Sequence, residues 1–468
     1  MYKIKIFPSR IRTIIGIFAI LPELFFSSCR KWVTIPPPRD QVVTATVFMD
    51  DKTATAAVLG IYSQMLGASP GNLIMGGATL FPGLSADEIY SAKTSTVYEP
   101  FASNSLLKDN NSVLSALWRA PYAYIYQANV CLEGLAASTT LSAHVKRQLM
   151  GECLFARAYC YFYLTGLYND VPLETTTQYQ TNQIAPRSPS AKVLQQVITD
   201  LDSAQALLVP AYPVTGPIRP NKWAAAALQA RAYLYQKSWP AAEAAATAVI
   251  NSGMYTLVSD LNAVFLANSS EAILQFKPVQ FNQNSVDGSL FIPSSATVIP
   301  AFAVPDYTLA AFETGDLRKS SWIKSNTVGG KTYSYPYKYK VRNGFTVTEY
   351  NMVERLAEQY LIRAEARAQQ NDISGATADL DTIRVRAGLP VLPISLDKAT
   401  CLLAVEQERR IELFMEWGHR WLDLRRTGRI DAVLGAEKSN WTSTDSLYPI
   451  PFKEIQKNVF LTQNPGYN

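Results

Sequence analysis

Residues 408–429, ERRIELFMEWGHRWLDLRRTGR, combine side chains that could act in catalysis or metal binding. Their 22 positions hold four acids, six arginines and one of the chain's two histidines. Glu416 and His419 have the Glu-x-x-His spacing of carboxylate-bridged two-metal sites, but such a site needs a second Glu-x-x-His element. The other histidine, His144, has no glutamate three residues before it. We therefore expect no metal site and no cofactor.

Glu412 and Glu416 could instead form the acid and base pair of a glycoside hydrolase. One helical turn separates them, so both would approach a sugar from the same side, whereas catalytic carboxylates flank the scissile bond. The sequence also offers no Ser/His/Asp set and no glycine loop that would bind phosphate. We predict that the protein is not an enzyme.

A structural role explains the run better. Drawn on one continuous helix, its apolar residues form two stripes: Ile411, Phe414, Met415, Gly418 and Leu422, and Leu413, Trp417, Trp421 and Leu424. A helix that is apolar on two sides is buried, and its charges must then be paired. Glu416 and Arg420 have the favourable i,i+4 order for such a pair. The run is therefore predicted to be a central packing helix.

The elements around this run are mostly helical. Apolar residues at helical spacing predict helices at about 50–66, 112–136, 143–168, 189–208, 221–236 and 240–253, and a helix pair over 354–388. The related stretches ARAYCYFYL, ARAYLYQ and IRAEARAQQ place small residues at close-packing positions, which is typical of TPR-like helix pairs. The fold class is therefore predicted as mostly α, with TPR-like helix pairs forming a scaffold.

Three segments lack a helical period. Residues 67–110 are rich in Gly, Ser and Asn and are predicted to be a long ordered loop. Residues 254–348 contain turn signals and short β-like runs, including tyrosines 333, 335, 337 and 339, which would lie on one face of a strand. Residues 441–468 are predicted to be loop. These segments predict an irregular, loop-rich portion with short β-strands.

The N-terminus has the order of an export signal. Basic residues at 3–12 precede the apolar stretch IIGIFAILPELFF and two serines before Cys29. We predict a lipoprotein signal peptide over residues 1–28, with Cys29 lipidated, and a proline-containing tether over 29–45; an ordinary cleaved signal or an N-terminal anchor is the alternative. The rest, 46–468, is predicted to be a single body, with helical parts at 46–253 and 349–468 and an irregular insertion at 254–348.

Charge and cysteine content limit the partners. The chain carries +5, of which residues 1–28 contribute +3, so the remainder carries only +2. This small excess does not predict nucleic-acid binding. Cys153 and Cys160 would be about 10 Å apart on one helix, too far for a disulfide. We expect the cysteines of the body to be buried thiols.

Five stretches resemble, in order, the signatures of the SusD/RagB family. They are WRAPYAYIYQAN (118–129), GECLFARAYCYFYLTGLYNDVPL (151–173), RLAEQYLIRAEA (355–366), ERRIELFMEWGHRWLDLRRTG (408–428) and YPIPFKEIQKNVFLTQNPGY (448–467). Members of this family are lipid-anchored outer-membrane proteins that bind nutrients, mostly glycans, and cap a SusC-like TonB-dependent transporter barrel. The resemblance implies an outward-facing outer-membrane lipoprotein that binds oligosaccharides and delivers them to such a barrel. A peptide-binding lipoprotein of the same architecture and a TPR-like assembly scaffold without a small ligand are the alternatives.

Glycan binding requires accessible aromatic rings, because the C–H face of a sugar packs on the negative face of a ring. The rings on the predicted loops are therefore the candidate binding residues, together with neighbouring acids. They are Phe81, Asp87, Glu88, Tyr90, Tyr98 and Phe101 in the first loop, and Tyr307, Phe312 and Trp322 in the insertion. Trp322, which lies between Lys319 and Lys324, is expected to be exposed and is the foremost candidate.

Overall fold

The computed structural model describes residues 44–393 and 395–467. Residues 1–28, Cys29 and most of the predicted tether lie outside the described residues. Thr44–Val47 forms a single helical turn, α2. Phe48–Asn468 forms one compact unit.

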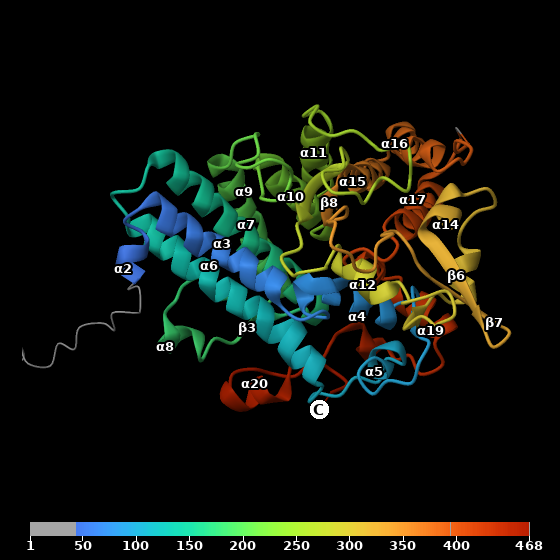
Figure 1. Cartoon of the computed structure of the whole chain (residues 1–468), viewed down its shortest axis with the longest axis horizontal. Helices are drawn as coiled ribbons and strands as arrows, with labels where there is room; N and C mark the ends of the chain where they lie inside the picture. The colour runs from blue at the N-terminus through green and yellow to red at the C-terminus, as the bar shows by residue number, and fades with distance from the viewer. Residues whose placement is uncertain (1–43, 394, 468) are drawn as a thin grey trace, which may run out of the picture. The chain divides into compact units, whose positions relative to one another are not determined.

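Long helices in this unit pack against one another in chain order (Figure 1). They confirm most of the predicted helices within a few residues: α3 Asp51–Gly67, α7 Ala143–Tyr168, α9 Ser190–Leu207, α10 Lys222–Tyr235, α11 Trp239–Ile250, α15 Leu356–Gln369 and α16 Ile373–Arg386. The helix predicted at 112–136 is formed by the π-helical segment η4 (Val113–Arg119) followed by α6 (Ala120–Ala137). Helix α7 packs on α6 and α9, α10 packs on α9 and α11, and α15 packs on α11 and α16. The scaffold is thus built of helix pairs, as predicted.

Small residues allow these helices to approach closely. In α10 every residue from Ala224 to Ala232 is buried, and Ala230 packs with Ala246 of α11 and Ala366 of α15. The start of α10 is defined by Asn221, whose side chain accepts hydrogen bonds from the amides of Trp223 and Ala224 at 3.0 and 2.9 Å. A polar cap followed by an alanine-rich stretch therefore explains both where α10 begins and why it lies at the centre of the scaffold.

The strands are short and form four two-stranded antiparallel sheets within the described residues. They pair as β1 (Tyr90–Ser91) with β5 (Phe302–Ala303), β2 (Val171–Pro172) with β3 (Arg187–Ser188), β4 (Ala272–Phe276) with β8 (Asn351–Arg355), and β6 (Ile323–Val328) with β7 (Lys331–Pro336). The hairpin of β6 and β7 turns at Gly329-Gly330, whose φ angles are 59° and 77°. The short helices α12 (Val286–Phe291), α13 (Asp306–Ala310) and α14 (Leu317–Trp322) complete the irregular portion.

The segment predicted as one long loop, 67–110, is partly helical. It contains a π-helical turn, η3 (Leu73–Gly77), and the helices α4 (Ala78–Ser85) and α5 (Glu99–Ala102). Every residue of α4 is buried, so its sequence has no polar face and therefore no helical period. The loop prediction is wrong for these residues because periodicity cannot detect a helix that is surrounded on all sides.

The run 408–429 is largely buried over residues 408–424, as predicted, whereas residues 427–429 are exposed, and the run is not one helix. Helix α17 (Lys398–Glu412) ends at Glu412, and α18 begins at His419 and ends at Thr427. Between them Met415, Trp417 and Gly418 have φ angles of 51°, 48° and 68°, which end a right-handed helix. The predicted pair of Glu416 with Arg420 is therefore replaced by longer-range pairs.

These pairs join distant parts of the chain. Arg355 of β8 donates to Glu416 from Nε at 2.8 Å and to Glu412 from Nη1 at 2.6 Å. Lys338 bridges Glu416 at 2.5 Å. Burial raises the pKa of Glu412, but the guanidinium groups of Arg386 and Arg355 outweigh it and hold that pKa well below its usual value. The acids of the run act as buried structural anions.

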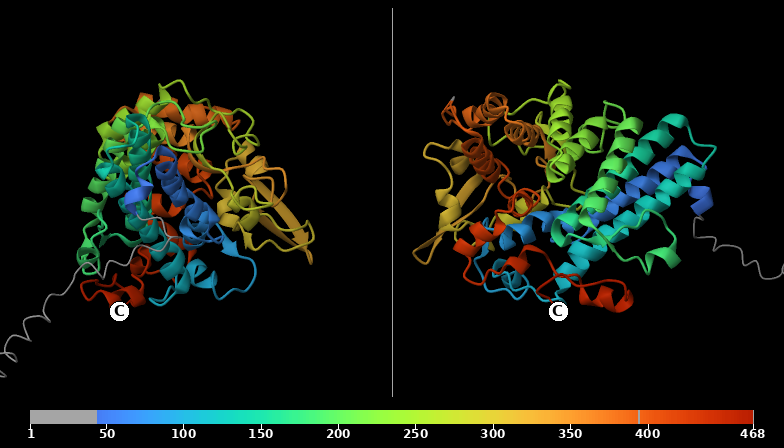
Figure 2. Two further views of the ribbon diagram at one scale, coloured as in Figure 1. Left: turned by 60° about the vertical axis from the view of Figure 1, so that its left-hand side comes forward. Right: turned by 180° about the vertical axis from the view of Figure 1, so that it is seen from behind.

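The C-terminal segment is also more ordered than predicted. After α19 (Ile430–Glu437), the stretch predicted as loop contains the 3-10 turn η5 (Ser443–Ser446) and helix α20 (Phe452–Lys457). Helix α8 (Tyr179–Asn182) lies on the same edge of the unit as α20 (Figures 1 and 2).

The cysteines at 131, 153, 160 and 401 are buried and unpaired, as expected. None of the described helices is long and apolar enough to cross a membrane.

Candidate functional site

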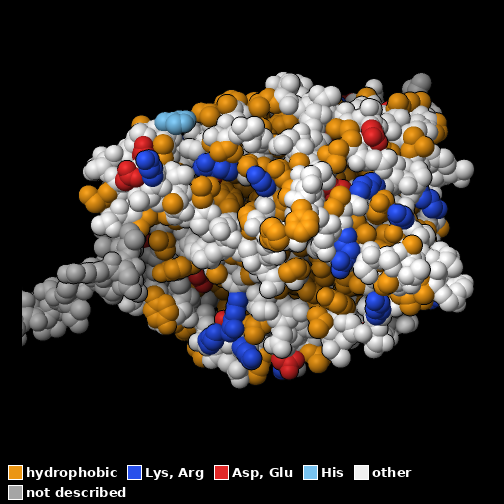
Figure 3. All heavy atoms as spheres, viewed as in Figure 1, with side chains coloured by type: hydrophobic (Ala, Val, Ile, Leu, Met, Phe, Trp, Pro, Cys, Tyr) orange, Lys and Arg blue, Asp and Glu red, His pale blue; other side chains and the backbone are white. Residues whose placement is uncertain are grey.

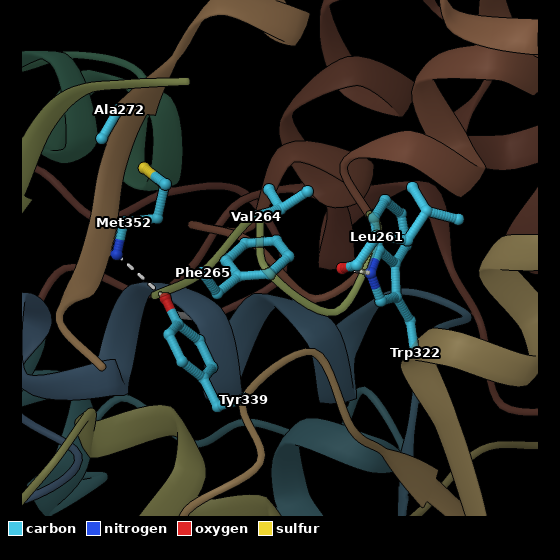
Figure 4. Packing of buried hydrophobic residues seen from close by; sticks show 7 residues of the cluster. All are labelled: Leu261, Val264, Phe265, Ala272, Trp322, Tyr339 and Met352. Atoms are coloured by element: carbon cyan, nitrogen blue, oxygen red, sulfur yellow. Dashed lines mark hydrogen bonds between the residues drawn. The ribbon is translucent and has the colours of Figure 1, made fainter. Parts of the chain in front are cut away.

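Trp322, the foremost candidate from the sequence, is fully buried. Its side chain lies in a cluster with Leu261, Phe265 and Tyr339, and its indole N–H donates to the Leu261 carbonyl at 3.0 Å (Figure 4). The Lys338 ammonium lies 4.2 Å from the ring centroid. The prediction that Trp322 is exposed is therefore wrong, since its exposed fraction is 0% and no face of the ring is free for a sugar.

Three further rings are also packed in the core. Phe81 and Phe101 contact each other at a centroid distance of 4.4 Å, and Phe101 also contacts Tyr448 at 5.7 Å. Phe312 contacts Phe414 at 6.2 Å. Because Phe81, Phe101 and Phe312 are buried, the expectation that they present rings to solvent is wrong.

The two predicted polar contacts, Asp87 and Glu88, are buried as well. Asp87 accepts two hydrogen bonds of 2.8 Å from the Arg420 guanidinium. Glu88 accepts from the backbone amide of Met415 at 2.7 Å, and burial raises its pKa to about 7. Asp87 thus ties the segment after α4 to α18, and Glu88 ties it to the turn that connects α17 and α18. They position that segment and do not face a ligand.

Three predicted residues keep accessible surface. Tyr90 lies in β1 and is half-buried, and Tyr307 of α13 is 39% exposed. Tyr98 is also half-buried, and its ring meets Phe302 edge to face at 4.8 Å. Among the three, Tyr98 lines a substantial hollow.

This hollow, the Tyr98 hollow, has a volume of about 360 Å³. Its walls include Ser69, Pro70, Asn72, Val97 and Tyr98, and Phe81 also contributes to its lining. The Tyr124 hydroxyl donates to the Asn72 side-chain oxygen at 3.3 Å, and the Asn72 amide nitrogen donates to no described residue. The hollow therefore combines an aromatic ring with a polar group that is available to a ligand.

An exposed aromatic pair lies on the segments next to this hollow. Phe281 and Phe345 are 86% and 78% exposed, yet their rings meet at a centroid distance of 5.5 Å. The Gln280 amide donates to the Ala68 carbonyl at 3.2 Å, which brings the pair close to the hollow's first residue, Ser69. The two rings form an exposed apolar patch, which makes this face a candidate interaction surface.

The backbone around the pair is held in place. The Gly344 amide donates to the Asn282 carbonyl at 3.0 Å, and the Asn284 side chain donates to the Thr346 carbonyl at 3.1 Å. The Asn284 oxygen also accepts from the Thr348 amide at 2.7 Å. The two segments that carry the rings are thus held together by hydrogen bonds. This order lowers the entropic cost of binding a ligand.

The residues next to the two phenylalanines in the sequence indicate that the rings are exposed, although neither ring belongs to a periodic pattern. Phe281 stands in QFNQN and Phe345 in NGFTV, where the neighbouring residues are mostly polar. Apart from Val279 and Val347, which lie two positions from the rings and are themselves exposed, the residues of these stretches are polar or glycine. Phe81, by contrast, stands among apolar residues in ATLFPGL and is buried.

The pair and the hollow together suit binding of a ligand with polar groups and apolar faces. On the face drawn in Figure 3, hydrophobic side chains gather around the region where Figure 1 labels α4 and α12. No group of three or more His, Cys, Asp or Glu side chains that could hold a metal ion occurs among the described residues.

Two parts of the chain match known family descriptions. Residues 85–234 match a SusD-like family described as "Starch-binding associating with outer membrane", and residues 305–467 match the SusD family. A SusD-like protein of Formosa agariphila is 26% identical over 520 residues, covering 95% of this chain and 97% of that protein.

Solved structures share the fold. A SusD superfamily protein from Bacteroides vulgatus ATCC 8482 superposes with a TM-score of 0.78 at 21% identity, over 89% of this chain and 99% of that chain. A laminarin-binding SusD-like protein gives a TM-score of 0.75 at 24% identity, over 89% and 99%. These structures show the shared fold, and the two family matches and the Formosa relative, together with the motifs at 118–173 and 355–467, show that the chain belongs to the SusD/RagB family.

Proposed function

We propose that this protein binds oligosaccharides on the face formed by the Phe281–Phe345 pair and the Tyr98 hollow. The observation that carries the proposal is the pair itself, whose rings are 86% and 78% exposed and contact each other. Such rings offer flat, electron-rich faces to the C–H groups of a sugar. The Asn72 amide in the neighbouring hollow supplies a donor for hydroxyl groups.

The family context supports the same class of ligand. One matching family is described as starch-binding, and one structural neighbour binds laminarin. We therefore propose a glycan ligand for this chain, and starch and laminarin are both candidates. Tyr90 and Tyr307, which keep accessible surface, remain candidate contacts for a longer ligand.

The location and partner follow from the N-terminal pattern and the family resemblance. We propose that Cys29 carries a lipid, that the body is displayed outward from the outer membrane, and that it delivers the glycan to a SusC-like TonB-dependent barrel. The two candidate catalytic acids, Glu412 and Glu416, are buried and ion-paired with Arg355, which supports binding without hydrolysis.

Affinity gel electrophoresis with starch, laminarin and other polysaccharides tests the proposal. At least one polysaccharide is expected to retard the protein. The double substitution Phe281→Ala/Phe345→Ala is expected to weaken that interaction at least about tenfold, or about 1.4 kcal/mol. Val391→Ala is the control, because Val391 is 62% exposed and lies on the segment after α16.

Two results would contradict the proposal. One is retardation of Phe281→Ala/Phe345→Ala as strong as that of the parent protein, which would show that the two rings do not contact the glycan. The other is the absence of retardation by every glycan combined with measurable binding of peptides, which would favour a peptide-binding lipoprotein. Released sugars after incubation with the polysaccharide would show hydrolysis and would revive the enzyme interpretation.

A further inference from the structure

A second and larger groove lies on the edge of the unit formed by η4 (Val113–Arg119), α6, α8 and α20. It has a volume of about 660 Å³, which lies in the range of small-molecule sites. Helices α8 and α20 lie along the same side of α6 in the views of Figures 1 and 2. None of the residues that line it also lines the Tyr98 hollow.

An aromatic stripe forms one wall of this groove, here named the α8–α20 groove. Trp118, Tyr122 and Tyr126 follow at four-residue spacing, so they lie on one face of η4 and α6, about 6 Å apart along the axis. Their exposure increases along the stripe, from 4% for Trp118 to 49% for Tyr126. Tyr179, which begins α8, adds a ring that is 70% exposed.

The inner rings are fixed before any ligand arrives. Trp118 packs against Tyr122 at 5.2 Å and against Tyr168 at 4.9 Å. The Tyr122 hydroxyl donates to the Pro172 carbonyl at 2.8 Å. A ligand that stacks on this wall therefore pays little entropy for ordering it.

Polar groups line the groove as well. Arg119 Nε lies 2.6 Å from Glu454 Oε1, and Lys457 Nζ lies 3.3 Å from the same oxygen. Glu174 supplies a carboxyl that accepts no side-chain hydrogen bond and forms no ion pair with any described residue. Burial raises the pKa of Glu174 to about 7, so near neutral pH this group can donate as well as accept.

We propose that the α8–α20 groove is a second oligosaccharide subsite, separate from the Phe281–Phe345 face. This inference rests on the proposed glycan binding and adds a site to it. The groove joins exposed ring faces to groups that both donate and accept, which matches the alternating C–H faces and hydroxyl groups of a neutral sugar chain. Two subsites on one body would raise the affinity for a polysaccharide long enough to engage both.

The test compares two double variants of the full protein. Isothermal titration with a short oligosaccharide from the polysaccharide that retards the protein is expected to show two sites per chain. Phe281→Ala/Phe345→Ala is expected to leave one site, and Tyr126→Ala/Tyr179→Ala is expected to leave the other. On the polysaccharide gel, the tyrosine variant is expected to bind at least about tenfold more weakly than the parent protein.

Two controls separate ring contact from altered folding. Tyr126→Phe/Tyr179→Phe keeps the rings and is expected to keep the second site. Phe460→Ala removes a ring that is 54% exposed and close to α20 but does not line the groove, and it is expected to change nothing. If Tyr126→Phe/Tyr179→Phe lost as much binding as Tyr126→Ala/Tyr179→Ala, the stacking role of the two rings would be overturned.

The outcomes distinguish this inference from the proposed function. A single site per chain that is lost in Phe281→Ala/Phe345→Ala and unchanged in Tyr126→Ala/Tyr179→Ala would overturn the second subsite. It would leave the proposed glycan binding intact. Capture of a protein partner that depends on Tyr126 and Tyr179, with unchanged glycan binding, would also overturn it. Failure of the parent protein to bind any glycan would instead refute the proposed function itself.

Discussion

Replacement of Arg355 by methionine is the most direct test of how the charged run 408–429 stabilises the fold. Methionine keeps much of the length and apolar volume of arginine but removes the guanidinium. Arg355 donates to carboxylates of Glu271, Glu412 and Glu416 at 2.8, 2.6 and 2.8 Å. It also donates to the Glu412 carbonyl at 2.7 Å. All of these partners are buried.

The expected magnitude follows from what remains after the change. Glu271 keeps Arg386 at 2.7 Å, Glu412 keeps Arg318 at 3.1 Å, and Glu416 keeps Lys338 at 2.5 Å. Three buried carboxylates would then share three cations that already have other partners. Breaking one buried pair by removing a single member costs about 3–5 kcal/mol, and we expect Arg355→Met to lower the free energy of unfolding by about this amount.

Urea unfolding at pH 7 measures this loss. Arg429→Met is the matched control, because Arg429 pairs with Glu406 at 3.2 Å but its side chain is 46% exposed. An exposed pair contributes about 0–1 kcal/mol. Equal losses for the two variants would refute the view that burial makes the Arg355 network costly to break.

The pH dependence gives an independent check. Burial raises the pKa values of Glu412 and Glu416, but neighbouring cations outweigh it and hold both below the usual 4.5. Carboxylates with lowered pKa values stabilise the fold above pH 4.5, and this contribution is lost as pH falls through their folded-state values. The difference between parent and Arg355→Met is therefore expected to be largest near pH 7 and to narrow in acid. A difference independent of pH would contradict the electrostatic explanation.

Three further changes test single features by unfolding measurements. Gly418→Ala is expected to destabilise by about 1–3 kcal/mol, because φ is 68° and a new Cβ would lie 2.7 Å from the Ala78 carbonyl. Trp322→Phe is expected to cost about 1–3 kcal/mol by leaving the Leu261 carbonyl without its donor and opening a void. Burial raises the Glu88 pKa from 4.5 to about 7, so the contribution of Glu88 to stability should fall by about 3 kcal/mol as pH rises between these values. Glu88→Gln should remove this contribution, which appears as a difference between the two pH profiles of unfolding.

The sequence was informative where local pattern and burial agree. Helix α9 has Val193, Val197 and Leu201 buried on one face and polar residues on the other, so its period was visible. Helix α4 is buried on all sides and offered no period. In the run 408–429 the apolar pattern continues at helical spacing through Met415 and Trp417, although both residues have positive φ. Local pattern cannot show that tertiary contacts impose such a turn.

The candidate site was harder to predict, because the exposure of a loop ring depends on contacts distant in sequence. Trp322 lies between two exposed lysines and still turns inward, since Leu261 supplies a carbonyl and Lys338 a cation for its ring. Phe281 and Phe345 meet only in the folded protein, 64 positions apart. Their polar neighbours indicated exposure, but nothing local indicated that they would pair.

The turn between α17 and α18 links the charged run 408–429 to the part of the chain that lines the Tyr98 hollow. The Trp417 amide donates to the Thr79 hydroxyl at 3.1 Å, and the Met415 amide donates to Glu88 at 2.7 Å. These bonds hold α4 and the residues after it, and α4 contributes Phe81 to the Tyr98 hollow. A helical 413–418 would point these amides at its own carbonyls and leave Thr79 and Glu88 without donors. The positive φ angles therefore free the amides of Met415 and Trp417 to hold α4 and Glu88, and α4 is the helix that brings Phe81 to the Tyr98 hollow.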